Sequence, residues 1–380
     1  MSATYVFAKQ AAAPEYDRAL AWAALLLMAM GLVMVYSASI STAESSRHTG
    51  SNAAYYLMRH TVFLGVALSG ALAVFLVPVR YWQKAAPWLF LGGVALLVLV
   101  LVPGIGREVN GARRWIDLGA LTMQPSELMK LAVPMGIAWY LHDKPLPPTF
   151  GQLLVAFGIV GLPTLLTAVQ PDLGTAALIA ASGLFAIYCS GILWRYILGA
   201  AALIGAVTPF LWARLHDYQK LRVLNFLDPE RDPLGSGYHI IQSKIAVGSG
   251  GVFGKGWLEG TQSQLDFLPE RHTDFIFAVA GEEFGLLGAL LLLATYMFVL
   301  YRSLKLAAGA ERTFGRLLGG AIALTFVVYV FVNIGMVCGL LPVVGVPLPL
   351  ISYGGTSLVT LMAGFGILMS IHTHRKLMSL

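Results

Sequence analysis

Long apolar runs constrain this chain more than any other feature. About ten segments of the 380 residues are apolar for long enough to cross roughly 30 Å of hydrocarbon as helices. Hydrophobic residues make up 57% of the chain and charged residues only 12%, against about 25% charged in soluble domains. The sequence therefore predicts an all-α, polytopic membrane protein, with spans near 18–37, 56–77, 86–102, 126–141, 150–169, 174–192, 193–215, 275–301, 317–341 and 352–371.

The chain reads as one domain covering residues 1–380. No low-complexity tract or linker divides it, and no internal repeat is evident. Many secondary transporters are built from repeats, so that plan is disfavoured. The long interruption at 216–274 stands just before the eighth predicted helix and is the largest polar loop.

Basic residues predict the orientation. Ten spans place both termini on one side, and short loops rich in Lys and Arg mark the cytoplasmic face. Most basic residues of the short loops fall on the side of the termini, while Arg113 and Arg114 on the opposite side are evidence against this orientation. We expect a multi-pass protein of the bacterial cytoplasmic (inner) membrane with both termini in the cytoplasm, and a large extracytoplasmic loop at 216–274. The supporting basic residues are Arg80, Lys84, Lys144, Arg195, Arg302, Lys305, Arg312, Arg316, Arg375 and Lys376.

Several other classes are not favoured. The net charge of +6 is modest, and in such a chain basic residues more often set orientation than bind nucleic acid. Cys189 and Cys338 lie in apolar stretches without a metal-ligand spacing partner, so neither a disulfide nor a cysteine metal site is expected. The first apolar run lacks a clear small-residue cleavage site, and no cleavable signal peptide is expected.

The segment 248–274 carries the most informative carboxylate. It is rich in glycine and polar residues, ends at Asp274, and is followed at once by an apolar helix. Thr273 or Asp274 could simply cap that helix, and His272 with Asp274 is too small a set to predict a metal. Around Lys255 the glycines fit neither a phosphate-binding loop nor a dinucleotide fingerprint.

Further polar groups lie where burial is costly. Pro125 signals a helix start, so Glu127 and Lys130, three apart, share one face and can pair. That pair is either structural or the charged wall of a substrate cavity. Arg113 suits phosphate, although its segment could serve only as an interfacial anchor. Asp172 follows a proline between two apolar runs and could be only a helix cap.

Prolines dominate the segment 341–355. Three of them within eight residues forbid a regular helix. Non-helical backbone near membrane depth is tolerated where it lines a wet cavity or is buried in protein. We therefore expect this segment to cover a cavity on the outer face.

These motifs together resemble the SEDS (shape, elongation, division, sporulation) family of membrane proteins over essentially the whole chain. The densest similarity lies in QPSELMK (124–130), QPDLGTA (170–176), residues 227–257, GTQSQLDFLPERHTDFIFAV (260–279) and residues 333–355. The segment GKGWLEGTQSQ is similar to the elongation branch. The segment GLVMVYSASI (31–40) is closer to the division branch.

The resemblance implies a peptidoglycan glycosyltransferase that polymerises lipid II at the outer face of the membrane during cell elongation. It implies Asp274 as the catalytic residue and general base, and a class B penicillin-binding protein as partner. Besides lipid II and membrane lipids no other ligand is certain, although a divalent cation (Mg or Mn) could accompany the pyrophosphate. A lipid II flippase and a non-catalytic scaffold for the partner remain as alternatives. The candidate substrate-binding residues are Glu127, Lys130, Arg113, Asp172, Lys244 and Ser352.

Overall fold

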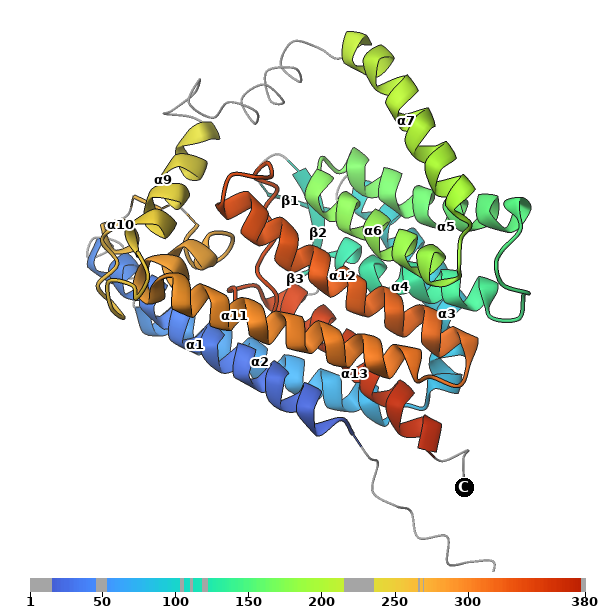
Figure 1. The fold of residues 1–380 in the computed structure, drawn as a ribbon, viewed down its shortest axis with the longest axis horizontal. Helices are drawn as coiled ribbons and strands as arrows, with labels where there is room; N and C mark the ends of the chain where they lie inside the picture. The colour runs from blue at the N-terminus through green and yellow to red at the C-terminus, as the bar shows by residue number, and fades with distance from the viewer. Residues whose placement is uncertain are drawn as a thin grey trace, which may run out of the picture.

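A computed structural model of the chain describes residues 16–45, 53–102, 106–109, 112–117, 122–214, 236–265, 267–268 and 270–376. Long helices packed side by side form a bundle (Figure 1). The helices are α1 (Arg18–Ser45), α2 (Ala53–Leu76), α3 (Val79–Leu101), α4 (Pro125–Leu141), α5 (Phe150–Val169), α6 (Leu173–Cys189), α7 (Trp194–Arg214), α9 (Ser236–Ser249), α10 (Thr261–Gln264), α11 (Ile276–Ala308), α12 (Thr313–Val337) and α13 (Gly355–Lys376).

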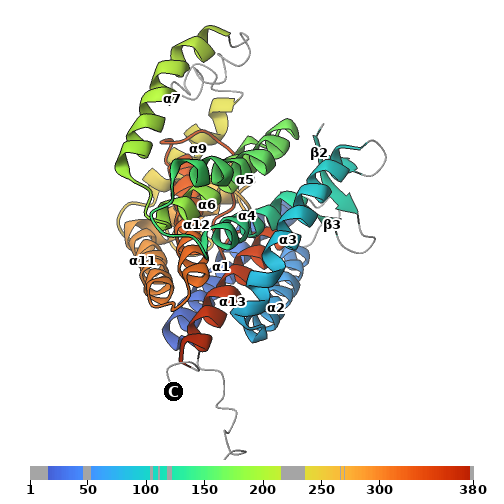
Figure 2. The ribbon, with the colours of Figure 1, turned by 90° about the vertical axis from the view of Figure 1, so that its right-hand side faces the viewer.

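The predicted membrane spans coincide with helices. Seven of them, α1, α2, α3, α5, α11, α12 and α13, are long and apolar enough to cross a membrane. The other three predicted runs fall on α4, α6 and α7, of which α4 and α6 are each 17 residues long. Figures 1 and 2 show α7 extending away from the other helices. The predicted helical membrane fold is therefore confirmed, with several boundaries moved by a few residues.

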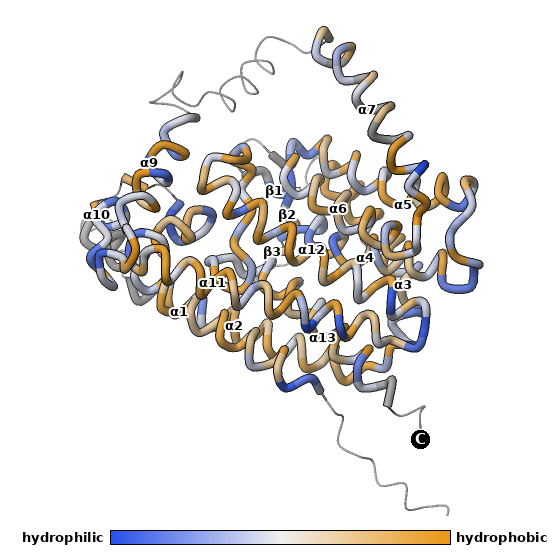
Figure 3. Tube along the Cα trace, in the orientation of Figure 1, coloured by the Kyte–Doolittle hydropathy of each residue, from blue (hydrophilic) through white to orange (hydrophobic). Residues whose placement is uncertain are grey.

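Apolar side chains lie on both the inside and the outside of the bundle. Buried residues such as Leu27, Met129 and Leu318 form a large core between the helices. Other large apolar side chains, such as Leu165 at 67% and Phe331 at 61%, are exposed. Figure 3 shows apolar residues along the helices and hydrophilic ones concentrated in connections. An outer surface of this kind is suited to lipid rather than water.

The start of α1 and the end of α13 lie at the same end of the bundle. Asp17, just before α1, forms a hydrogen-bonded ion pair with Arg302 near the end of α11. Ser370 near the end of α13 donates a hydrogen bond of 2.7 Å to the carbonyl of Val77, which follows α2. This geometry agrees with the prediction that both termini share one side.

The segment between α3 and α4 contains a small sheet that the sequence did not predict. Strands β1 (Gly106–Val109), β2 (Ala112–Asp117) and β3 (Thr122–Met123) are antiparallel in the order β1-β2-β3. Arg107 pairs with Trp115 in the first ladder and Ile116 with Met123 in the second. Figure 2 shows the sheet at the end of α3, away from the bundle centre. The protein therefore has a small sheet in addition to the predicted helices.

The predicted loop at 216–274 is partly helical. Helices α9 and α10 lie within it, while residues 216–235 fall outside the described part of the chain. Residues 250–256 pack against a break in α11, where Gly285 has φ 63° and ψ −162°. At the break, Lys255 N–H donates to the carbonyl of Glu282 at 3.0 Å, and Leu286 N–H donates to the carbonyl of Gly251 at 2.9 Å. The glycine-rich segment thus provides partners for backbone groups that the broken helix leaves unpaired.

The break separates two parts of α11. Its 33 residues correspond to about 50 Å of helix, more than the roughly 30 Å of hydrocarbon. Residues 286–308 alone provide about 34 Å. The turns before Gly285 are therefore available to carry Asp274 beyond the hydrocarbon layer.

We expect Gly285→Ala to destabilise the protein clearly. An added Cβ would lie 2.3 Å from the Gly254 nitrogen, and this region of φ and ψ, nearly exclusive to glycine, costs a side chain on the order of 1–3 kcal/mol. Gly248→Ala is the matched control, because nothing lies within 4 Å of its Cβ position and its φ is ordinary. Thermal unfolding in detergent should show a lower Tm for the first variant only, and equal Tm values would contradict the tight packing at the break.

Candidate functional site

Asp274 lies just before α11 and does not cap it. The helix begins at Ile276, and its N-cap residue is Phe275, which makes no side-chain capping hydrogen bond. The reading of Thr273 or Asp274 as a helix cap is therefore wrong. The Asp274 Oδ2 instead lies 3.4 Å from the position that a Cβ on Gly345 would take. Its carboxylate therefore lies against the proline-rich segment.

The proline-rich segment is bound to the residues around Asp274. It is non-helical from 339 to 354, as predicted. Ser352 donates a hydrogen bond of 2.6 Å to the carbonyl of Thr273 and accepts one of 2.7 Å from Leu348 N–H. Tyr353 N–H donates to the carbonyl of His272 at 2.9 Å. Ser352, a predicted substrate-binding residue, thus holds two segments of the site together.

The environment of Asp274 alters its acidity. Burial and, to a smaller extent, the nearby negative charge of Glu270 together raise the pKa of Asp274 to about 6. Burial also lowers the pKa of His272 below its usual value. A carboxylate with such a pKa is ionised at neutral pH yet more basic than an exposed one, which suits a general base.

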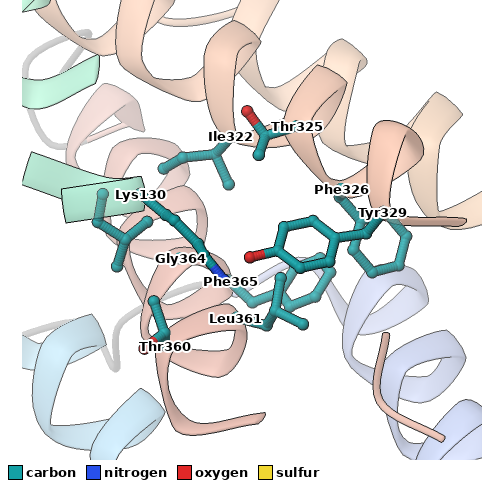
Figure 4. A pocket seen from close by; sticks show the side chains of 10 residues that line it. Lys130, Ile322, Thr325, Phe326, Tyr329, Thr360, Leu361, Gly364 and Phe365 are labelled. Carbon is teal, nitrogen blue, oxygen red and sulfur yellow. The ribbon is translucent and has the colours of Figure 1, made fainter. Parts of the chain in front are cut away.

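Glu127 and Lys130 form the predicted ion pair. Helix α4 begins at Pro125, and the Lys130 Nζ lies 2.6 Å from the Glu127 Oε1, with both residues buried. The Lys130 Nζ is also 5.0 Å from the ring centre of Tyr329 on α12. Figure 4 shows the side chains of Lys130 and Tyr329 extending toward each other. A charge at this depth is retained because both a carboxylate and an aromatic ring face it.

A small cavity adjoins Lys130. Its volume is about 30 Å³, room for one or two water molecules. Its lining, drawn in Figure 4, comes from α4, α12 and α13, and Asp274 is not part of it. This space adjoins Lys130 alone of the three residues Asp274, Glu127 and Lys130.

Helix α12 connects the two groups instead. Asn333 binds the carbonyl of Asp274 at 2.8 Å, and Tyr329 contacts Lys130. These two residues are four apart, so they lie on one face of α12, about 6 Å apart along its axis. Neither was predicted as a site residue. A polar residue in an otherwise apolar run was the only signal that marked Asn333.

Asp172 has a mainly structural environment. Its Oδ1 accepts the Thr175 N–H at 3.1 Å and caps α6, and its Oδ2 accepts from Gln124 at 3.0 Å. Arg114 lies 3.6 Å from the same carboxylate and donates to the carbonyls of Gln170 and Pro171. The reading of Asp172 as a helix cap is confirmed. Arg113, the residue before Arg114 on β2, is half-buried.

The last candidate, Lys244, and two further carboxylates lie on α9 and α11. Lys244 is exposed on α9, with its Cδ near Gly339 at the end of α12. Glu282 is completely buried and pairs with Lys255 at 2.7 Å, while Glu283 accepts a hydrogen bond from Ser37 on α1. Among the described residues, no three His, Cys, Asp or Glu side chains are grouped closely enough to hold a metal ion.

Comparisons with known proteins agree with this arrangement. Residues 18–377 match the family model described as "Cell cycle protein", which is named for FtsW, RodA and SpoVE. The chain is 51% identical over 355 residues to the peptidoglycan glycosyltransferase MrdB of Escherichia coli K12, covering 93% of this chain and 94% of that protein. It is 42% identical over 370 residues to a probable peptidoglycan glycosyltransferase FtsW of Aromatoleum aromaticum, covering 94% of this chain and 88% of that one.

Solved structures share the fold. The rod shape determining protein RodA of Thermus thermophilus superimposes with a TM-score of 0.69 at 30% identity, over 95% of this chain and 97% of that one. A second solved structure is described as "Structural coordination of polymerization and crosslinking by a peptidoglycan synthase complex". A chain from it superimposes with a TM-score of 0.80 at 32% identity, over 95% of this chain and 98% of that one. The chain is therefore a member of the cell cycle protein family of FtsW, RodA and SpoVE, the SEDS family that its motifs predicted, with its higher identity on the elongation side.

Proposed function

We propose that this protein is a peptidoglycan glycosyltransferase that polymerises lipid II into glycan strands, with Asp274 as the general base. The observation that carries the proposal is the position of Asp274. Its carboxylate caps no helix, is half-buried, has a pKa raised to about 6 and lies against Gly345 of the proline-rich segment. The names of the relatives, with identities of 51% and 42%, support the same reaction.

The reaction requires one base and one source of positive charge. The acceptor 4-hydroxyl loses its proton to Asp274 while its oxygen bonds to the anomeric carbon of the donor. The bond from that carbon to the pyrophosphate oxygen breaks, and the polyprenyl pyrophosphate leaves with the electron pair. Preorganised cations stabilise the charge that develops on a leaving group. Lys130 and Arg113 are candidates for this role. Glu127 would orient Lys130, and Asp172, Lys244 and Ser352 are the other proposed substrate contacts.

A divalent cation, if used, would arrive with the substrate. The described residues contain no group of three metal-binding side chains, so the pyrophosphate oxygens would supply most of the ligands. Oxygen-rich ligand sets of this kind are preferred by Mg²⁺.

The proposal includes a location and a partner. Both termini would lie in the cytoplasm and the Asp274 end of the bundle outside it, in the cytoplasmic (inner) membrane. Support comes from the shared end of α1 and α13 and from the basic loops on that side. A class B penicillin-binding protein is the proposed partner, since a similar chain belongs to a peptidoglycan synthase complex.

Polymerisation should depend on pH with a midpoint of about 6. Asp274 accepts a proton only when ionised, so kcat/KM should fall as the pH decreases through that value. In Glu270→Gln the negative charge that raises this pKa is absent, and the midpoint should move to lower pH. The measurement is kcat/KM against pH for both proteins. An unchanged midpoint in the variant would remove Asp274 as the titrating group.

The function itself is tested with purified protein and labelled lipid II in liposomes, with and without the penicillin-binding partner. Formation of glycan polymer supports the enzyme. Movement of lipid II between leaflets without polymer would support the flippase alternative. Recruitment of the partner with neither polymer nor lipid movement would support the scaffold alternative.

A further inference from the structure

Asn333 joins two segments at the Asp274 end of the bundle. It is fully buried on α12, and its Nδ2 donates hydrogen bonds of 2.8 Å to the carbonyl of Asp274 and 2.7 Å to the carbonyl of Val346. Both partners are carbonyl oxygens, which can only accept. The amide orientation therefore follows from its partners and is not an arbitrary choice between nitrogen and oxygen.

These two hydrogen bonds hold the backbone of Asp274 and the backbone of the segment that faces its carboxylate. One holds the backbone of Asp274 itself. The other holds Val346, whose neighbour Gly345 lies against the Asp274 Oδ2 at 3.4 Å from its Cβ position. No side-chain hydrogen bond to this carboxylate is shown within the described residues, so its position depends on the backbone beneath it and the segment opposite.

The same face of α12 contacts the buried ion pair. Tyr329, one turn before Asn333, lies beside Lys130, and Lys130 binds Glu127 at 2.6 Å. A helix turn is stiff, with a fixed rise of 1.5 Å per residue. Two contacts on adjacent turns therefore set the separation between the segments that carry Asp274 and Lys130.

We propose that Asn333 is a positioning residue for Asp274, and that Tyr329 and Asn333 make this face of α12 the spacer between Asp274 and Lys130. The inference rests on the proposed function, because the spacing affects catalysis only if these two groups act on the substrate. A displacement of about 1 Å in a catalytic group can reduce a rate about 10²-fold. Loss of the Asn333 bonds should therefore affect kcat rather than substrate affinity.

The test compares Asn333→Leu, which is similar in size but has no donor, with Asn333→Gln, which retains both donors. We expect kcat for lipid II polymerisation to fall about 10²-fold in Asn333→Leu with little change in KM, and to recover in part in Asn333→Gln. Leu318→Ala is the control. Leu318 is fully buried on the same helix, about 22 Å from Asn333 along the axis, and its truncation should lower Tm without lowering kcat of the folded protein. If Asn333→Leu does not fold, Asn333→Ser, which keeps one donor, replaces it.

A second measurement does not need catalysis. Difference infrared spectra between each protein and its Asp274→Asn counterpart isolate the carboxyl band of Asp274 and follow its titration. The band should titrate at about pH 6 in the wild-type protein and at a lower pH in Asn333→Leu, because a displaced carboxylate regains solvent. It should remain unchanged in Leu318→Ala.

The outcomes separate the two claims. Wild-type kcat together with a wild-type titration in Asn333→Leu would overturn the inference and leave the proposed function intact. Equal losses in Asn333→Leu and Leu318→Ala would overturn it as well, since general destabilisation would then explain both. A wild-type protein that makes no polymer with its partner would refute the proposed function, while the infrared titration would still decide whether Asn333 positions Asp274.

Discussion

Asp274→Asn should reduce lipid II polymerisation to background, a loss on the order of 10²–10⁴-fold, while the protein remains folded. The substitution keeps the shape of the side chain but removes its ability to accept the proton of the acceptor hydroxyl. The fold should tolerate the change because Asp274 caps no helix and no side-chain hydrogen bond to its carboxylate is shown in the described part of the chain. The measurement is polymer yield and length from purified protein with its partner.

Stability provides the control for this variant. Burial raises the pKa of Asp274 to about 6, above the usual value for aspartate of about 3.9. The folded state therefore disfavours the ionised carboxylate, and stability decreases as pH rises from about 4 to 6. At pH 7.5 the neutral asparagine removes this unfavourable charge, so Tm should be equal or higher. Glu311→Gln, at an exposed carboxylate between α11 and α12, should leave both activity and Tm unchanged. Normal polymer from Asp274→Asn would refute the assigned base.

Lys130→Met should destabilise the protein by about 3–5 kcal/mol and abolish polymerisation. The methionine side chain has no charge, so the Glu127 carboxylate loses the Lys130 ammonium that lies 2.6 Å from it. Leaving a buried charge without its partner costs about 3–5 kcal/mol of stability. Thermal unfolding and polymer formation are measured on the same preparation. Arg302→Met is the matched control, because it breaks the pair with Asp17 at the other end of the bundle. It should lower Tm without lowering kcat of the folded fraction.

The double variant Glu127→Gln/Lys130→Met distinguishes a structural pair from a catalytic one. Replacing both members of a buried pair by neutral groups is often neutral for stability or better, so much of the lost Tm should return. Activity should stay absent if Lys130 supplies positive charge to the leaving pyrophosphate. Recovery of polymerisation together with stability would show that the pair only supports the fold.

Much of the fold could be predicted from the apolar runs. Every predicted span coincides with a helix, the pairing of Glu127 with Lys130 followed from their spacing and Pro125, and Asp172 caps α6 as its place in the turn indicated. These are local properties, set by periodicity, caps and prolines within a few residues. The sheet at 106–123 was missed because its short strands lie in a loop between spans and carry no strong alternation.

The site was harder to predict because its contacts join distant residues. The sequence marked Asp274 as a carboxylate at the start of a span, and it marked 341–355 as non-helical. It did not identify Lys255 of the glycine-rich segment as the partner of the buried Glu282, and it did not predict the break in α11 at Gly285. It also left Asn333 unnoticed within an apolar helix.

The sequence by itself determined that this chain is a bundle of membrane helices with a polar segment ending at Asp274, since the length and hydropathy of each run depend only on neighbouring residues. Only the tertiary structure decided what surrounds Asp274. Ser352 holds the proline-rich segment against Thr273, and Asn333 binds the carbonyl of Asp274 from α12. Such contacts depend on how helices far apart in the chain pack, and burial among them is what raises the pKa of Asp274 to about 6.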